Sequence, residues 1–172
     1  MPNQNPHQKA GRIMFMLAFA VGLFMLTQFF DNVLDDQRNP NQQILSVNNN
    51  GVVDVVLDRN RYGHYVATGT INGEPVEFLV DTGATDIAIP AGLAQRLNLK
   101  RGIEFDVMTA NGITSAYRTR LDRITLGDIE LRNVRASINP SMDDMEILLG
   151  MSFLGQLELI QKNDQLTVRQ RQ

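Results

Sequence analysis

Short runs of alternating apolar and polar residues fill most of the chain after residue 50, and they predict a domain built from β-strands. Asn-Gly is the strongest short signal for a hairpin turn, and it stands between two such runs at Asn72-Gly73 and again at Asn111-Gly112. Many short strands at this spacing are typical of a closed β-sandwich or barrel. Strands are expected at residues 52–57, 64–71, 76–80, 103–108, 113–120, 123–126, 129–134, 136–138, 147–149, 157–160 and 166–168.

Helical patterns in this part of the chain are short. Pro90 precedes residues 91–97, and proline is favoured at the start of a helix. Residues 152–156 are expected to form a helical turn. The fold class predicted after residue 50 is therefore all-β with one or two short helices.

The N-terminal part has a different pattern. Residues 13–30 are mostly apolar and carry no charge, and about 20 such residues are needed to span a membrane. A cleaved signal peptide would end in a small-x-small cleavage site, and no good site follows this segment, so an uncleaved transmembrane anchor is favoured. Lys9 and Arg12 precede the segment and Asp31 follows it, which predicts an N-terminus inside the cell and an exported domain. In a bacterium this arrangement corresponds to a single-pass inner-membrane protein with a periplasmic domain.

Residues 31–50 contain six Asn and three Gln and few apolar residues. Such a composition buries too little apolar surface to offset the entropy lost on ordering. We therefore expect a cytoplasmic stub at residues 1–12, an anchor at 13–30, a disordered tether at 31–50 and one folded domain at 51–172.

Composition excludes several classes of function. The 172 residues suit one compact domain better than two full-sized lobes, and the absence of cysteine excludes disulfides, thiol nucleophiles and zinc–thiolate sites. The net charge of −3 without basic blocks argues against a nucleic-acid partner. Two histidines, His7 and His64, are too few for a histidine-rich metal site. No metal or cofactor is expected.

One tripeptide, Asp81-Thr82-Gly83, places a carboxylate at the end of an apolar strand. An ordinary strand end is the simpler interpretation, since Asp and Gly are common in turns, and chance alone gives this tripeptide in roughly a few per cent of chains of this length. The surrounding sequence decides between the two. A second apolar strand further along ends in Leu148-Leu149-Gly150 before a short helix. Between them lies the 103–120 hairpin with its tip at Thr109, Ala110, Asn111 and Gly112.

Together these three features resemble a retropepsin-type aspartic protease, and more closely the membrane-anchored, single-span group of such enzymes in bacteria. The resemblance covers about residues 60–160. It implies a closed β-barrel and an endopeptidase in which two aspartates hold one water. Like charges about 3 Å apart cannot both ionise, so one carboxyl becomes the acid and the other the base. Because the chain has one Asp-Thr-Gly, the resemblance implies a homodimer with Asp81 from each subunit.

The resemblance also assigns roles to the neighbouring residues. Thr82 would form hydrogen bonds across the two-fold axis, and Gly83 would let the backbone approach the substrate. Ala84 and Thr85, with the hairpin tip at residues 109–112, would contact an extended peptide, and the hairpin would close over it as a flap. Leu148, Leu149 and Gly150 would form the strand beside the catalytic loop.

Two positions depart from the retroviral pattern, which has an acid after Asp-Thr-Gly-Ala and an arginine after the downstream glycine. Here these positions are Thr85 and Met151, so a different dimer contact is expected. Residues 157–169 could form that contact or pack on their own subunit. An alternative function is a membrane-anchored binding or scaffold domain with this fold and no turnover. A further hypothesis is that the enzyme cuts its own tether at residues 31–50.

Overall fold

The computed structural model describes residues 6–109, 112–142 and 146–171. The chain divides into two compact units, Met1–Gln37 and Arg38–Gln172. In the first unit, the described residues 6–37 belong to helix α1 (Pro6–Arg38), whose last residue, Arg38, is the first of the second unit. Its stretch Gly11–Arg38, of 28 residues, is long and apolar enough to cross a membrane. This stretch contains the predicted anchor at 13–30.

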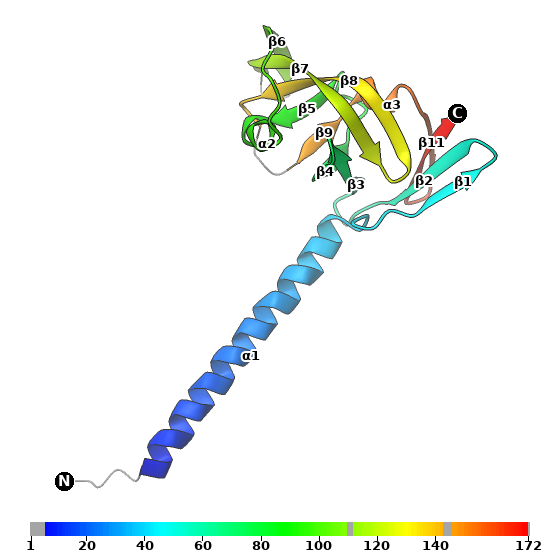
Figure 1. Ribbon diagram of the computed structural model, residues 1–172. Helices are drawn as coiled ribbons and strands as arrows, with labels where there is room; N and C mark the ends of the chain where they lie inside the picture. Colours follow the sequence, from blue (N-terminus) through cyan, green and yellow to red (C-terminus); the bar gives the residue numbers. More distant parts are fainter. Residues whose placement is uncertain (1–5, 110–111, 143–145, 172) are drawn as a thin grey trace. The chain divides into compact units, whose positions relative to one another are not determined.

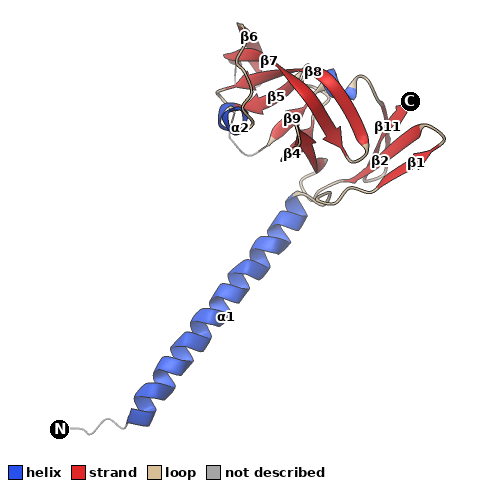
Figure 2. Cartoon of the chain, in the orientation of Figure 1, coloured by secondary structure: helices blue, strands red, loops and turns tan. Residues whose placement is uncertain are grey.

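The second unit is a β-domain with two sheets in its described part (Figures 1 and 2). The larger sheet has, in spatial order, β3 (Val66–Ile71), β4 (Glu74–Val80), β9 (Ile147–Leu149), β5 (Ile87–Pro90), β8 (Ile129–Asn139), β7 (Gly112–Leu126) and β6 (Glu104–Thr109). The smaller sheet has the order β1 (Ser46–Asn49), β2 (Val52–Asp58), β11 (Gln165–Arg171) and β10 (Glu158–Lys162). Two short helices, α2 (Ala91–Arg96) and α3 (Met151–Leu154), complete the domain. The predicted all-β fold with short helices is confirmed.

The larger sheet closes on itself because β3 also pairs with β7, through Thr70↔Thr125 and Ile71↔Ile124. Gly69 makes this closure feasible. A Cβ atom at this position would lie 2.3 Å from the carbonyl oxygen of Thr125 and 2.7 Å from the ring of Phe78. Any larger residue would push the two strands apart.

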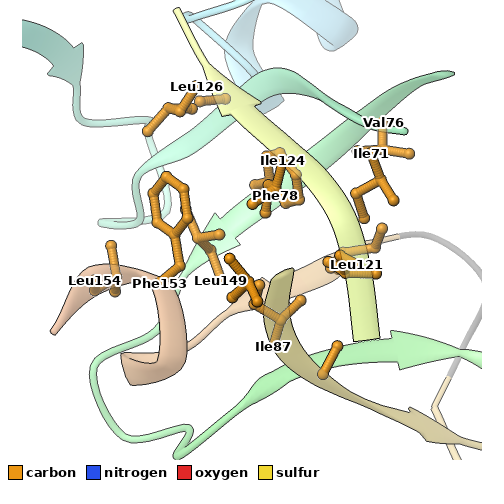
Figure 3. Close-up of a cluster of buried hydrophobic side chains, with 14 of the residues drawn as sticks. Ile71, Val76, Phe78, Ile87, Leu121, Ile124, Leu126, Leu149, Phe153 and Leu154 are labelled. Carbon is orange, nitrogen blue, oxygen red and sulfur yellow. The ribbon is translucent and has the colours of Figure 1, made fainter. Parts of the chain in front are cut away.

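One hydrophobic core joins the two sheets. Residues of β2 and β3 alternate between buried and more exposed positions, as the period-2 pattern predicts. Figure 3 shows Phe78 of β4, Leu149 of β9 and Phe153 of α3 in this cluster. The smaller sheet contributes side chains such as Val55 and Val168, which are fully buried in the same cluster. The strands around the Asp81 loop are therefore anchored by the main core of the domain.

Residues 31–50 were expected to be a disordered tether, but the structure has regular elements in this segment. Residues 31–38 continue α1, and residues 46–49 form β1, which pairs with β2. Between them, Asn41 is 4% exposed and its Nδ2 donates to the carbonyls of Val66, at 2.7 Å, and Asp58, at 2.9 Å. Hydrogen bonds thus order a segment that has little apolar surface. The prediction of disorder considered only the burial of apolar surface.

Two further details refine the predicted strands. The strands expected at 113–120 and 123–126 form one continuous strand, β7. Its partner β8 contains Asn133 with a positive φ of +55°, but the β7–β8 register is the same on both sides of this residue. The C-terminal stretch packs on its own chain, because β11 pairs with β2 along Gln165↔Asp58 to Arg171↔Val52. Packing on its own subunit is one of the two alternatives left open for this stretch; a dimer contact by the end strand β10 stays a prediction.

Candidate active site

Asp81 directly follows β4, in the loop that leads to β5. The chain leaves β4, turns, and returns as β5 on the other side of β9. β9 is parallel to β4, with Val80↔Leu149 in register, and antiparallel to β5, with Ala88↔Leu148. The amide of Asp81 donates to the carbonyl of Leu149 at 3.2 Å. The predicted Leu-Leu-Gly strand is thus the strand that holds both ends of the Asp81 loop.

The Asp81 carboxylate is half-buried and held by its own turn. Its Oδ1 accepts a hydrogen bond from the amide of Gly83 at 2.8 Å, and its backbone carbonyl accepts one from Ala84 at 3.3 Å. A Cβ atom on Gly83 would lie 3.1 Å from Oδ1, which is a tight contact. Within the described residues, the other carboxylate oxygen has no hydrogen-bond partner. One oxygen is therefore fixed and the other is left available for a water or a substrate.

Thr82 and Thr85 are exposed, and Ala84 is half-buried. The hydroxyl of Thr82 has no hydrogen-bond partner among the residues that the structure describes. The structure thus places Thr82, Gly83 and the Asp81 carboxylate together on one surface turn.

Gly150 lies directly against this loop. It is buried, and a Cβ atom there would lie 2.3 Å from the carbonyl oxygen of Asp86 and 2.7 Å from that of Ala84. The first amides of α3 then donate into the loop, Met151 to the carbonyl of Ala84 at 2.8 Å and Ser152 to that of Thr85 at 2.9 Å. The Asp81 loop therefore rests on the β9–α3 junction through backbone contacts that only a glycine permits.

Ser152 is a site-supporting residue that the sequence did not indicate. Its hydroxyl donates to the carbonyl of Arg135 at 2.8 Å and accepts from the amide of Ile87 at 3.0 Å, so it joins α3 to β8 and β5. Asp86 lies in the same area, with Oδ1 3.7 Å from Nη2 of Arg135. In the sequence, Ser152 is only a serine in the first turn of a short helix. Serine is so common at helix starts that this position alone does not indicate a supporting role.

The predicted hairpin is present, with β6 and β7 paired from Glu104↔Tyr117 to Thr109↔Gly112. Ala110 and Asn111, assigned to its tip, lie outside the described residues. Met108 and Ile113 face each other across the two strands and are 82% and 71% exposed. This apolar pair is exposed near the described end of the hairpin.

The residue positions that depart from the retroviral pattern, Thr85 and Met151, are both at the loop–α3 contact. Met151 is 41% exposed. At these positions the retroviral pattern has an acid and an arginine. Here the Asp81 loop and α3 are joined by backbone hydrogen bonds from Met151 to Ala84 and from Ser152 to Thr85.

Comparisons with known proteins agree with this geometry. Residues 67–156 match the family described as "gag-polyprotein putative aspartyl protease". A crystal structure of a retropepsin-like aspartic protease from Rickettsia conorii is similar, with 29% identity, a TM-score of 0.58, and coverage of 74% of this chain and 95% of that one. The fold is that of a retropepsin-like aspartic protease, and the matched residues 67–156 include the Asp81 loop.

The chain belongs to the gag-polyprotein type of aspartyl protease family. Two curated relatives are themselves uncharacterized proteins. One, described as lying in a cobV 5′ region of Sinorhizobium sp, is 36% identical over 134 residues, and one from Rickettsia prowazekii is 32% identical over 106 residues. These matches cover 76% and 60% of this chain, but the chain spans only 58% and 45% of the two relatives.

Proposed function

We propose that the protein is an aspartic endopeptidase that hydrolyses peptide bonds with a water held between the Asp81 carboxylates of two subunits. One observation carries this proposal. The chain belongs to an aspartyl protease family, and in its Asp81 loop the Gly83 amide donates to Asp81 Oδ1 at 2.8 Å. The second carboxylate oxygen has no partner within the described residues. A carboxylate that is oriented but not fully paired is suited to bind a catalytic water.

In the proposed mechanism, two Asp81 side chains share one proton because both cannot be charged at close range. The ionised carboxylate takes a proton from the water, whose oxygen attacks the scissile carbonyl. The protonated carboxyl donates its proton to the carbonyl oxygen. The carboxyl that took the water's proton then donates it to the leaving nitrogen, the carbon–nitrogen bond breaks, and the other carboxylate takes back a proton from a hydroxyl of the tetrahedral intermediate.

A homodimer is part of the proposal because the chain supplies one Asp-Thr-Gly loop. The exposed Thr82 hydroxyl, without a partner in the described part of the chain, is suited to bond to the second subunit's loop. In a symmetric dimer both copies of this bond form at once. Thr82 and Gly83 are therefore proposed to shape the joint active site.

The proposed substrate is an extended protein segment. It would lie between the Asp81 loop, with Ala84 and Thr85, and the β6–β7 hairpin, with residues 109–112 acting as a flap. The exposed pair Met108 and Ile113 supports a hairpin that covers apolar substrate side chains. Strand addition of this kind gives affinity through the main chain and selectivity through side-chain pockets.

The proposed location is the bacterial inner membrane, with residues 13–30 as a single span, the N-terminus inside and the domain in the periplasm. The support is the apolar stretch Gly11–Arg38, with Lys9 and Arg12 near its N-terminal end. Self-cleavage within residues 31–50 that frees the domain is also proposed. Residues 31–37 precede the second unit but belong to α1, so this part of the helix would have to unwind before it binds as an extended strand. A mass spectrum of purified protein that shows only the intact chain after days would contradict self-cleavage.

The proposal is tested with the full-length chain in detergent and an unfolded protein substrate, between about pH 4 and pH 7. The wild type should cleave, and Asp81→Asn should lower kcat/KM by at least about 10³-fold, because a neutral amide cannot accept the proton from water. Asp128→Asn is the matched control, since Asp128 is exposed at the β7–β8 turn, and it should keep wild-type activity.

Equal cleavage by wild type and Asp81→Asn would contradict the proposed chemistry. Absence of cleavage by a folded, dimeric wild type would favour the alternative function, a membrane-anchored binding or scaffold domain with this fold. Sedimentation of the same samples establishes whether the protein is dimeric.

A further inference from the structure

Arg38, the first residue of the domain unit, contacts two acidic residues of the strands that carry the candidate active site. Its Nη2 lies 2.7 Å from Oε2 of Glu77, and its Nε lies 3.1 Å from Oε1 of Glu146. Glu77 belongs to β4, which ends at the Asp81 loop, and Glu146 precedes β9, which ends at Gly150. One guanidinium thus joins the middle of β4 to the start of β9.

The pairing of β4 with β9 explains why a cation is needed at this point. The described parallel pairing is only three pairs long, from Phe78↔Ile147 to Val80↔Leu149. Glu77 and Glu146 precede the first pair by one residue each, so two negative charges face each other where the pairing starts. Like charges in opposite positions on neighbouring strands are destabilising. Both side chains are only partly exposed, 34% and 26%, so water does not fully screen the repulsion.

The residues after Arg38 fix it in place. Asn39 is 1% exposed, and its Nδ2 donates to Oε1 of Glu77 at 2.9 Å. The carbonyl of Arg38 accepts a hydrogen bond from Nδ2 of Asn60 at 2.8 Å. The amide of Thr68 donates to the carbonyl of Asn41 at 3.1 Å, so the segment is bonded alongside β3. Residues 38–41 are therefore built into the domain, on the side of β3 and β4.

We propose that Arg38 is a positioning residue of the active site, and that residues 38–41 are a strap that holds β3, β4 and the start of β9 together. This inference rests on the proposed function and deepens it. Arg38 neutralises the Glu77–Glu146 pair and so keeps β4 and β9 in register, which places the Asp81 turn on Gly150. A cut that releases an active domain must consequently fall before Arg38.

The test uses the full-length protein with Arg38→Ala and with the triple variant Arg38→Ala/Glu77→Gln/Glu146→Gln. Arg38→Ala should lower kcat/KM about 10- to 100-fold, mainly through kcat, because a displacement of about 1 Å at a reacting group has this effect. The triple variant should recover to within about threefold of wild type, since the two neutral amides no longer repel. With kcat measured at a temperature at which all three proteins are folded, a role limited to general stability would leave the kcat of Arg38→Ala at the wild-type value.

Arg132→Ala is the matched control. It removes an equally short ion pair, 2.7 Å from Arg132 Nη2 to Glu130 Oε1, in β8, which pairs with neither β4 nor β9. It should keep wild-type kcat and KM. Wild-type activity in Arg38→Ala, or a triple variant no better than Arg38→Ala, would overturn the proposal.

Hydrogen–deuterium exchange of the same proteins gives a readout that does not depend on activity. In Arg38→Ala, amides of β4 and β9 should exchange faster, while those of β10 and β11 stay unchanged, and the triple variant should restore slow exchange. If the wild type does not cleave, the proposed function fails, and the exchange data still decide whether Arg38 positions these strands. Unchanged exchange in Arg38→Ala would overturn the positioning role.

Discussion

Gly150 is a residue at which the backbone of the candidate site is tightly packed. The carbonyls of Asp86 and Ala84 occupy the space in which a side chain would begin, since a Cβ atom there would lie 2.3 Å and 2.7 Å from their oxygens. Its identity therefore follows from sterics, independently of any contact with substrate. The same contact explains why a hydrophobic strand ending in glycine accompanies the Asp-Thr-Gly loop.

Gly150→Ala should lower the free energy of unfolding by about 1–3 kcal/mol, because the loop must shift to admit the methyl group. The displaced Asp81 should also reduce cleavage. Thermal unfolding and activity of the full-length chain measure the two effects. Gly22→Ala is the control, since a Cβ atom there has no neighbour within 4 Å. A variant as stable and active as wild type would refute the steric account.

Ser152 connects three elements through one hydroxyl. Ser152→Ala leaves the amide of the fully buried Ile87 without its 3.0 Å acceptor, which should cost about 1–3 kcal/mol. Urea unfolding at neutral pH measures the loss. Ser141→Ala removes an exposed contact with Thr114 and should change stability by less than about 0.5 kcal/mol. Equal effects of the two substitutions would contradict the proposed link between α3, β5 and β8.

The sequence indicated some of these residues and missed others for a physical reason. Asp81, Gly83 and Gly150 occur in short local patterns, so they were predictable. Ser152 and Arg38 act through partners that are distant in sequence, Ile87 for the first and Glu77 for the second. Such contacts depend on the fold, and no local pattern contains them.

At the scale of elements, the smaller sheet is crossed by a row of alternating charges. Arg169 of β11 stands opposite Asp54 of β2 on one side and Glu158 of β10 on the other. Its Nε and Nη2 lie 2.7 Å and 2.8 Å from the two carboxylate oxygens of Asp54. Hydrogen bonding to Arg169 is the main cause that lowers the pKa of Asp54 below its usual value of 3.8. This bidentate pair joins the C-terminal strand to β2.

The pH dependence of this pair follows from the sign of the shift. A lowered pKa means that the unfolded chain binds the proton more readily, so the stabilisation is present above about pH 3.8 and is lost as the pH falls through the lower folded value. Asp54→Asn should therefore be less stable than wild type at pH 6, and the difference should shrink below about pH 3.8. Urea unfolding from pH 7 to pH 3 measures it, with Asp128→Asn as the control. A difference that does not vary with pH would contradict this account.

The strand pattern predicted most elements, including both Asn-Gly hairpins, but it missed β1 and the strap. Both lie in a segment rich in asparagine. Their order comes from hydrogen bonds such as those of Asn41 to Asp58 and Val66, not from apolar burial. Periodicity of apolar residues carries no information on such bonds.

At the scale of the whole molecule, each chain forms its smaller sheet from its own strands. β10 is at one end of this sheet and β1 at the other. Of the two C-terminal strands, β11 is paired on both sides within one chain and β10 on one side. We place the proposed subunit contact at the Asp81 loops because each chain supplies one Asp-Thr-Gly. A single chain has one such loop, so the proposed activity must depend on two chains meeting.

A mixing titration tests this central claim most directly. Full-length wild type and Asp81→Asn are mixed at constant total concentration, allowed to exchange subunits in detergent, and assayed for cleavage of an unfolded protein. If both carboxylates are required, activity follows the square of the wild-type fraction, so an equal mixture retains about one quarter of the wild-type activity. Activity that falls in proportion to the wild-type fraction, or a wild type that does not cleave, would contradict the account.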